Sequence, residues 1–232
     1  MISTKKQFIF VHIPKTAGSS VAWALRKHFD KPSPAQRMIM SISKRLSGRS
    51  PYTQSDFQPL DVHANAARYL QLLGDKFWEM RSIAFVRNPF DLQVSLYHYI
   101  IQTPAHPAHE RIKRLSFGEF LHRTCSNKRK TASQTSYLVD ENGKNLVSHI
   151  GRFETLADDF YRFCDHLGVY AKLDHINSST RKKSFVTLYS PELVEMVVDK
   201  FRCDFDNFGY STDPTCTEFG PIKLERHPKL AD

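Results

Sequence analysis

The sequence has no long hydrophobic segment. No stretch of its 232 residues approaches the ~20 consecutive apolar residues that a transmembrane helix needs. The first six residues, from Met1 to Lys6, contain no apolar signal segment. These absences predict a cytoplasmic protein without a transmembrane segment, although a chain trimmed of a membrane anchor would read the same way.

Cysteine is scarce and its spacing excludes the common zinc motifs. Cys125, Cys164, Cys203 and Cys216 form no C-x-x-C pair, and none stands beside a histidine at metal-ligand spacing. We therefore expect no metal site and interpret the four as buried free thiols. A disulfide among them stays open.

Acidic residues are too few to balance the basic ones. Lysine and arginine number 33 against 24 for aspartate and glutamate, which leaves a net charge of +9. Such a surplus favours anionic partners such as nucleotides or sulfated glycans, or it serves solubility alone. The basic residues are scattered and no zinc-finger or RNP motif is present, so we expect no nucleic acid partner. Nothing in the sequence indicates an oligomeric state.

Apolar runs alternate with helical patterns along the chain. Residues 7–13 (QFIFVHI) and 81–86 (RSIAFV) are nearly continuous apolar runs, typical of strands buried on both faces of a parallel sheet. A shorter strand is predicted over 146–153. Helices are expected between and after these strands, so we predict a three-layer α/β sandwich with a parallel sheet like that of P-loop NTPases, in one domain over 1–232.

Capping residues give the helix boundaries. Ser19 or Ser20 can cap a helix after the first strand, with Val21, Ala24 and Leu25 as its apolar face. The other predicted starts are Asn88-Pro89 (apolar stripe Leu92, Leu96, Tyr99), the capping box Ser116 to Glu119, Thr155 (ending at Gly168) and Ser190-Pro191 (ending near Phe201). Residues 31–60 form an irregular excursion near the acceptor site, with a short helix near 37–46, and 211–232 form a surface tail.

The loop after the first strand carries an anion-binding pattern. The segment from His12 to Ser20 (HIPKTAGSS) combines a lysine, a glycine and several hydroxyls directly before a helix. Gly18 lets the backbone approach a ligand, and the loop amides and helix N-terminus favour a phosphate. Lys15 adds a charge, while Thr16, Ser19 and Ser20 add hydroxyl donors. The segment is not a Walker A box, because G-x-x-x-x-G-K-[ST] is absent.

The second strand ends in a basic residue. Arg87 follows it directly, and Ser95 lies eight positions later on the next predicted helix. Arginine can hold a phosphate with two donors, and a serine two helical turns along can face the same pocket. A P-loop ATPase would normally place a magnesium-binding aspartate at this strand end.

These two motifs resemble those of sulfotransferases that use 3′-phosphoadenosine 5′-phosphosulfate (PAPS), in the heparan and chondroitin type of the carbohydrate branch. The resemblance implies that residues 15–20 (Lys15, Thr16, Ala17, Gly18, Ser19, Ser20) hold the 5′-phosphosulfate and that Arg87 and Ser95 hold the 3′-phosphate. It also implies transfer of a sulfuryl group from PAPS to a hydroxyl, with PAP as the product and without a metal.

Further segments extend the resemblance over most of the chain. Residues 151–160 (GRFETLADDF) are similar to the family's R-F-E-x-L-x-x-D-F segment, and 204–210 (DFDNFGY) to its D-F-x-x-F-G-Y ending. Residues 177–183 resemble the basic loop that closes over the nucleotide, which would add Ser179, Arg181 and Lys182 to the cofactor site. A solvated basic loop is an equal interpretation of that segment.

The expected mechanism needs a leaving-group acid and a general base. Lys15 is predicted to stabilise charge on the leaving nucleotide in an in-line transfer. His63 is the candidate base, because relatives carry their catalytic histidine in this region and histidine titrates near neutrality. Asp61 is the alternative base, and His12 is expected to support the loop from beneath.

The acceptor and two rival functions stay open. The resemblance of the loop to the carbohydrate branch favours a carbohydrate hydroxyl, and a lipid head group, a small natural product and a protein tyrosine stay open as acceptors. Scattered basic clusters (near 37–49, 113–114 and 128–130) would suit an anionic acceptor. The rivals are a nucleotide-dependent P-loop kinase and an inactive relative that only binds PAPS or nucleic acid.

Overall fold

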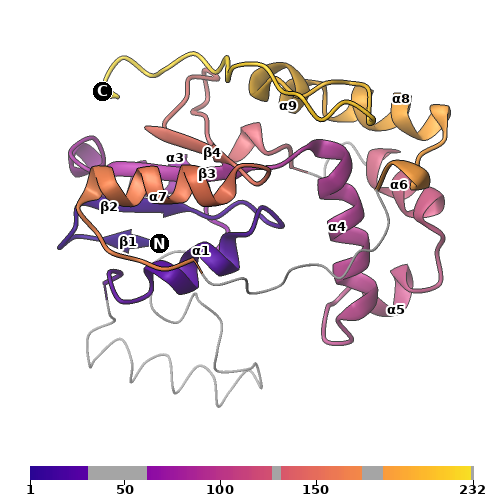
Figure 1. The fold of residues 1–232 in the computed structure, drawn as a ribbon, viewed down its shortest axis with the longest axis horizontal. Coiled ribbons are helices and arrows are strands. Elements are labelled where there is room, and N and C mark those ends of the chain that lie inside the picture. Colours follow the sequence, from indigo (N-terminus) through magenta and orange to yellow (C-terminus); the bar gives the residue numbers. More distant parts are fainter. Residues whose placement is uncertain (31–61, 127–131, 174–184, 231–232) are drawn as a thin grey trace.

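The chain folds into a mixed α/β structure around a four-stranded sheet. A computed structural model describes residues 1–30, 62–126, 132–173 and 185–230. The strands are β1 (Ile2–Ser3), β2 (Phe8–Val11), β3 (Arg81–Val86) and β4 (His149–Arg152), in that order across the sheet. The β2–β3 and β3–β4 pairs are parallel, whereas β1 pairs antiparallel with β2 (Figure 1). The predicted parallel sheet is thus confirmed, with one short antiparallel edge strand.

Helices surround this sheet and extend beyond it. The helices are α1 (Gly18–Leu25), α3 (Ala66–Leu73), α4 (Pro89–Gln102), α5 (His109–Ile112), α6 (Phe117–Ser126), α7 (Leu156–Leu167), α8 (Pro191–Lys200) and α9 (Arg202–Phe208). Short 3₁₀ turns are η2 (Gly74–Phe77), η3 (Thr135–Tyr137) and η4 (Phe185–Leu188). In Figure 1, α4, α5, α6 and α8 lie to one side of the sheet, and α7 runs across it.

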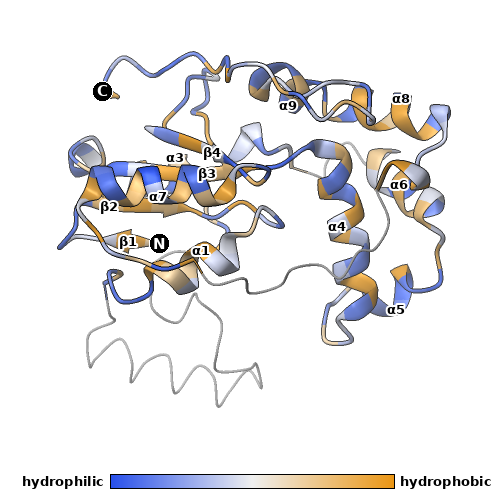
Figure 2. Cartoon of the chain, in the orientation of Figure 1, coloured by the Kyte–Doolittle hydropathy of each residue, from blue (hydrophilic) through white to orange (hydrophobic). Residues whose placement is uncertain are grey.

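Alternating side chains of the central strands build two cores, one on each face. Phe8, Phe10, Ile83 and Phe85 pack with α1 and α7. Ile9, Val11, Ala84 and Val86 instead join the larger core of α3, α4, α6, α8 and α9. Figure 2 shows hydrophobic colour along β2 and β3 and mixed colour on α7, as a strand buried on both faces and an amphipathic helix require. This is the predicted three-layer arrangement.

Most predicted helix boundaries are confirmed by their caps. Asn88 Oδ1 accepts a hydrogen bond from the Phe90 amide at 2.9 Å. Ser116 and Glu119 form the predicted reciprocal capping box, with side-chain-to-amide distances of 2.7 and 3.3 Å. Gly168 ends α7 in the left-handed conformation, and Ser190 caps α8. The sequence analysis did not predict α3 or α9.

The start of α1 was predicted wrongly. Neither Ser19 nor Ser20 is its cap, since both lie inside the helix. Ala17 is the N-cap, in a left-handed conformation with φ 67°, and its carbonyl accepts the first helical bonds. This earlier turn places the helix N-terminus immediately after the lysine-containing loop.

The buried face of α4 was also predicted wrongly. Leu92 and Leu96 are only partly buried and Tyr99 is exposed, whereas Phe90 and Val94 are fully buried. The reason is tertiary, because Phe90 packs against Tyr189 and Phe205 with ring centroids 5.1 and 5.0 Å apart. Contacts with the C-terminal part of the chain therefore set the rotation of this helix.

The fourth strand is shorter than predicted, and the chain before it is held by side chains. Asn145 bonds both the amide and the carbonyl of Val147, at 2.9 and 2.8 Å. Ser148 and Ser82 exchange side-chain-to-backbone bonds in place of a regular ladder. The predicted helix near 37–46 lies outside the described residues.

Candidate functional site

The loop between β2 and α1 turns tightly at two residues that are not glycine. Lys15 and Ala17 both have φ 67°, a conformation uncommon outside glycine. The Thr16 hydroxyl is buried and donates to the Ile13 carbonyl at 2.9 Å, which closes the turn. Successive amides in such turns form a concave anion-binding surface, and here the N-terminus of α1 follows directly.

Gly18 is required by packing against the residue beneath the loop. A Cβ at this position would lie 1.8 Å from Cδ2 and 1.9 Å from Nε2 of His12. The His12 ring is 5% exposed and stacks on Phe10. Gly18 was predicted to allow close approach of a ligand, and the structure adds a steric reason that involves His12. His12 supports the loop from beneath, as predicted.

His63 lies beside His12 at the end of β2. The two ring centroids are 4.6 Å apart, and Nδ1 of His63 lies 3.1 Å from the His12 carbonyl oxygen. A carbonyl oxygen only accepts, so this bond requires a proton on Nδ1 of His63. In the neutral ring, Nε2 then carries the lone pair. The geometry thus presents a potential proton acceptor next to the first loop.

Burial keeps His12 uncharged. It lowers the pKa of His12 to about 3, and the positive potential of His63 and of the N-terminal amine acts in the same direction. Within the described residues, Nδ1 of His12 has no hydrogen-bond partner. Because the His12 ring is uncharged, the positive potential at the first loop comes from Lys15 and the N-terminus of α1.

This lowered pKa predicts acid sensitivity. The unfolded chain binds a proton at His12 below pH ~6.5, but the folded chain does so only near pH 3. Stability from this group is therefore complete above pH ~6.5 and is lost as pH falls toward 3. Between pH 7 and 4, the unfolding free energy of the wild type should fall about 3 kcal/mol more than that of His12→Gln. Urea titrations across this range measure it, and parallel pH profiles would contradict it.

Arg87 joins the second strand to the first loop. Its Nη1 donates to the Lys15 carbonyl at 3.0 Å, and its Nε and Nη2 donate to Asp91 at 2.8 and 2.5 Å. The guanidinium is 3.7 Å from the centre of the Phe153 ring and the residue is buried. Lys15 in turn places Nζ 4.1 Å from the centre of the Tyr99 ring on α4. Arg87 therefore contacts the backbone of the first loop, while the Lys15 ammonium group lies against α4.

The strand end that carries Arg87 is fixed by distant segments. Gln134 bonds the Arg87 amide and carbonyl, both at 2.8 Å. Glu154 accepts from the Asn88 amide and from the Tyr210 hydroxyl, each at 2.8 Å. Charged and aromatic residues of 151–160 and 204–210 therefore have a structural role at this junction.

The remaining predicted residues are distributed as follows. Ser20 and Ser95 are buried on α1 and α4, whereas Ser19 is exposed. Ser179, Arg181, Lys182 and Asp61 lie outside the described residues.

All four cysteines are free thiols, and of these Cys164 is buried while Cys203 is exposed. Burial was therefore overestimated for the cysteines.

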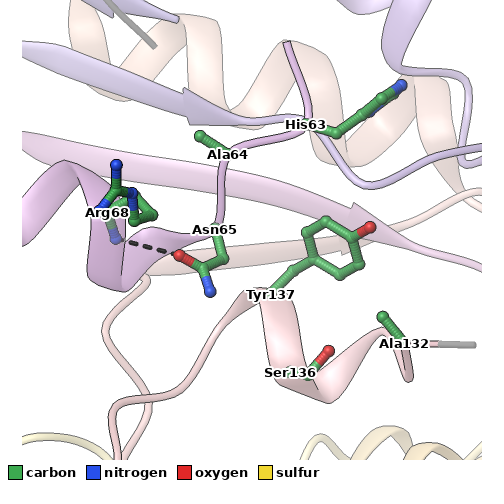
Figure 3. A pocket seen from close by; sticks show the side chains of 7 residues that line it. All are labelled: His63, Ala64, Asn65, Arg68, Ala132, Ser136 and Tyr137. Carbon is green, nitrogen blue, oxygen red and sulfur yellow. Dashed lines mark hydrogen bonds between the residues drawn. The ribbon is translucent and has the colours of Figure 1, made fainter. Parts of the chain in front are cut away.

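A pocket of about 380 Å³ opens beside His63. Its lining comes from two segments, residues 63–68 and 132–137 (Figure 3). The lining side chains are His63, Ala64, Asn65, Arg68, Ala132, Ser136 and Tyr137. The pocket combines an aromatic ring, a cation, an amide and a hydroxyl, a mixture that suits a polar organic ligand.

Sequence reasoning missed several residues that contact the predicted site. Asp91 could have been found, since it stands four positions after Arg87, in the first turn of the helix that follows. Gln134 and Tyr137 stand in no sequence motif that would have indicated a site.

In the described parts of the chain no helix is long and apolar enough to cross a membrane, and no cluster of His, Cys, Asp or Glu could hold a metal ion.

The fold and site define an α/β protein with a strand–loop–helix that carries Lys15 and a second basic residue, Arg87, directly after the neighbouring strand. The family model of the sulfotransferase family matches residues 1–211, and the chain belongs to this family. A comparison with curated protein sequences finds no significant match.

Solved sulfotransferase structures are similar to the chain. The structure of mouse sulfotransferase SULT7A1 complexed with PAP has a TM-score of 0.52 at 17% identity, over 87% of this chain and 86% of that one. A sulfotransferase from Alicyclobacillus acidocaldarius has a TM-score of 0.46 at 18% identity, over 86% and 92%. The first likeness confirms the sulfotransferase fold.

Proposed function

We propose that this sulfotransferase takes its sulfuryl group from PAPS and transfers it to a hydroxyl of a carbohydrate. The observation that carries the proposal is the contact between the two predicted phosphate sites, in which Arg87 donates to the carbonyl of Lys15. The similar mouse sulfotransferase was crystallised with PAP, which supports the same nucleotide here.

The residues present fit an anion with two charged ends. The turn at Lys15 and Ala17 and the start of α1 suit the 5′-phosphosulfate, with the hydroxyls of Ser19 and Ser20 nearby. The Thr16 hydroxyl is already bonded to Ile13, so Thr16 would contribute its amide. Arg87 and Ser95 would hold the 3′-phosphate, and Asp91 would orient the guanidinium toward the loop. Ser179, Arg181 and Lys182 are proposed to complete the nucleotide site.

Two side chains carry the proposed chemistry. PAPS supplies the sulfuryl group and leaves as PAP. Lys15 stabilises the charge that develops on the leaving oxygen. His63 takes the acceptor proton at Nε2, while the His12 carbonyl holds the proton at Nδ1 and fixes the ring.

The pocket beside His63 is proposed as the acceptor site. An aromatic ring such as that of Tyr137 can pack against the apolar face of a sugar, and Asn65 and Ser136 can bond its hydroxyls. Arg68 lines the same pocket and would favour an acceptor that carries a carboxylate or sulfate.

Calorimetry followed by a transfer assay tests the proposal. We expect PAP to bind and ATP with magnesium to bind much more weakly. Labelled PAPS is then offered with heparosan, chondroitin, a glycolipid and a simple phenol, and we expect label on a glycan. Binding of ATP with magnesium but not of PAP would instead indicate a kinase. Label on the phenol alone would overturn the carbohydrate acceptor.

A further inference from the structure

Gln134 acts as a buried clamp on the backbone of Arg87. Its side chain is 1% exposed. Oε1 accepts from the Arg87 amide and Nε2 donates to the Arg87 carbonyl, both at 2.8 Å. A single amide thus satisfies both backbone groups of the residue that directly follows β3.

Asp204 anchors this clamp from the other side. This α9 carboxylate is fully buried and accepts three bonds of 2.8 Å, from the amides of Gln134 and Thr135 and from the Thr135 hydroxyl. Burial raises the pKa of Asp204, and the bonds from Gln134 and Thr135 oppose that rise. Such a fully bonded buried carboxylate holds its donors in one arrangement.

The same short segment also forms one wall of the acceptor pocket. Ser136 and Tyr137 line the pocket and follow Gln134 within the turn η3. The Tyr137 amide donates to the Gln134 carbonyl at 3.0 Å. Leu138, directly after the turn, is fully buried. Displacement of Gln134 would therefore move Ser136 and Tyr137, which line the pocket together with His63 (Figure 3).

We infer that Gln134 and Asp204 are positioning residues that couple the donor site at Arg87 to the acceptor pocket. The inference rests on the proposed function, since it takes Arg87 as a nucleotide-binding residue. A nucleotide that binds Arg87 stabilises the clamped arrangement and so orders the Ser136–Tyr137 wall before the acceptor enters. Coupling of this kind is reciprocal, so an acceptor in the pocket would also favour the nucleotide.

The clamp is tested with a matched pair of variants. Gln134→Met removes both bonds to Arg87 and keeps a side chain of similar size. Asn145→Leu is the control, because Asn145 makes the same two-bond contact to a buried backbone, that of Val147 before β4, outside the proposed site. We expect Gln134→Met to weaken PAP binding about tenfold, since buried backbone groups lose their partners. Asn145→Leu should lower the melting temperature and leave PAP binding unchanged.

Hydrogen exchange tests the coupling without an acceptor. In the wild type, PAP should slow exchange of the Ser136 and Tyr137 amides as well as those of the loop at 14–20. In Gln134→Met, the loop should still be protected at saturating PAP, but the Ser136–Tyr137 segment should not. Thr135→Val removes one of the three bonds to Asp204 and should partly reduce the protection of the Ser136–Tyr137 segment by PAP. Asp204→Asn should abolish that protection.

The outcomes separate the inference from the function on which it rests. Failure of PAP to bind the wild type would refute both. PAP binding to Gln134→Met with wild-type affinity would refute the inference alone. Protection confined to the loop in the wild type would also refute it alone. If Gln134→Met weakened PAP binding only because it lowers the stability of the whole protein, Asn145→Leu would lose as much PAP affinity. This result too would overturn the inference.

Discussion

Lys15→Ala is expected to lower sulfuryl transfer by about 100- to 1,000-fold, the usual cost of removing one group that stabilises charge in a transition state. Lys15 lies in the strained turn between β2 and α1, and its Nζ is 4.1 Å from the centre of the Tyr99 ring. The variant removes the cation nearest the proposed leaving oxygen and keeps the fold of the loop. Initial rates with labelled PAPS at saturating acceptor measure the loss.

The control for Lys15 is a lysine at the other end of α1. Lys27 is exposed just after α1, so Lys27→Ala removes the same charge at a distance from the loop. It should retain wild-type rates, and Lys15→Arg should retain part of the activity because it keeps the charge but changes its geometry. Wild-type turnover by Lys15→Ala would remove this lysine from the mechanism.

The parts of the fold that sequence predicted well depend on local patterns. The run RSIAFV became β3 without any change of boundary, because a strand buried on both faces needs only continuous apolar residues. The caps at Asn88, Ser116 and Ser190 depend on a side chain and an amide two or three residues away. The strand–loop–helix at the first motif was predicted for the same reason.

The parts that sequence could not predict depend on residues that are distant along the chain. Gln134 is separated by 47 positions from Arg87 and by 70 from Asp204. The buried face of α4 is set by Tyr189 and Phe205, so its own periodicity was misleading. Gly18 appeared to be a ligand-contact glycine, whereas its closest constraint is the His12 ring. One amino-acid sequence does not indicate contacts between residues that are distant along the chain, because these contacts depend on how the helices and strands pack.

His63 was predicted from its position before the second strand, and the structure adds a geometric argument. Its Nδ1 is bonded to the His12 carbonyl, so the lone pair of the neutral ring lies on Nε2, the atom proposed to accept the proton. The ring centroids of His12 and His63 are 4.6 Å apart, and a charged His12 at that distance would disfavour a proton on His63. A neutral His12 therefore suits the proposed role of His63 as the base.

We therefore expect His63→Ala to lower turnover by about 100- to 10,000-fold, the usual contribution of a general base, and to leave PAP binding nearly unchanged. His166→Ala is the matched control, because His166 on α7 also bonds a backbone carbonyl through Nδ1, at 2.7 Å, and is exposed. Rates with labelled PAPS and PAP calorimetry on both variants give the comparison. Near-normal turnover by His63→Ala, together with a large loss in Asp61→Asn, would transfer the role of base to Asp61.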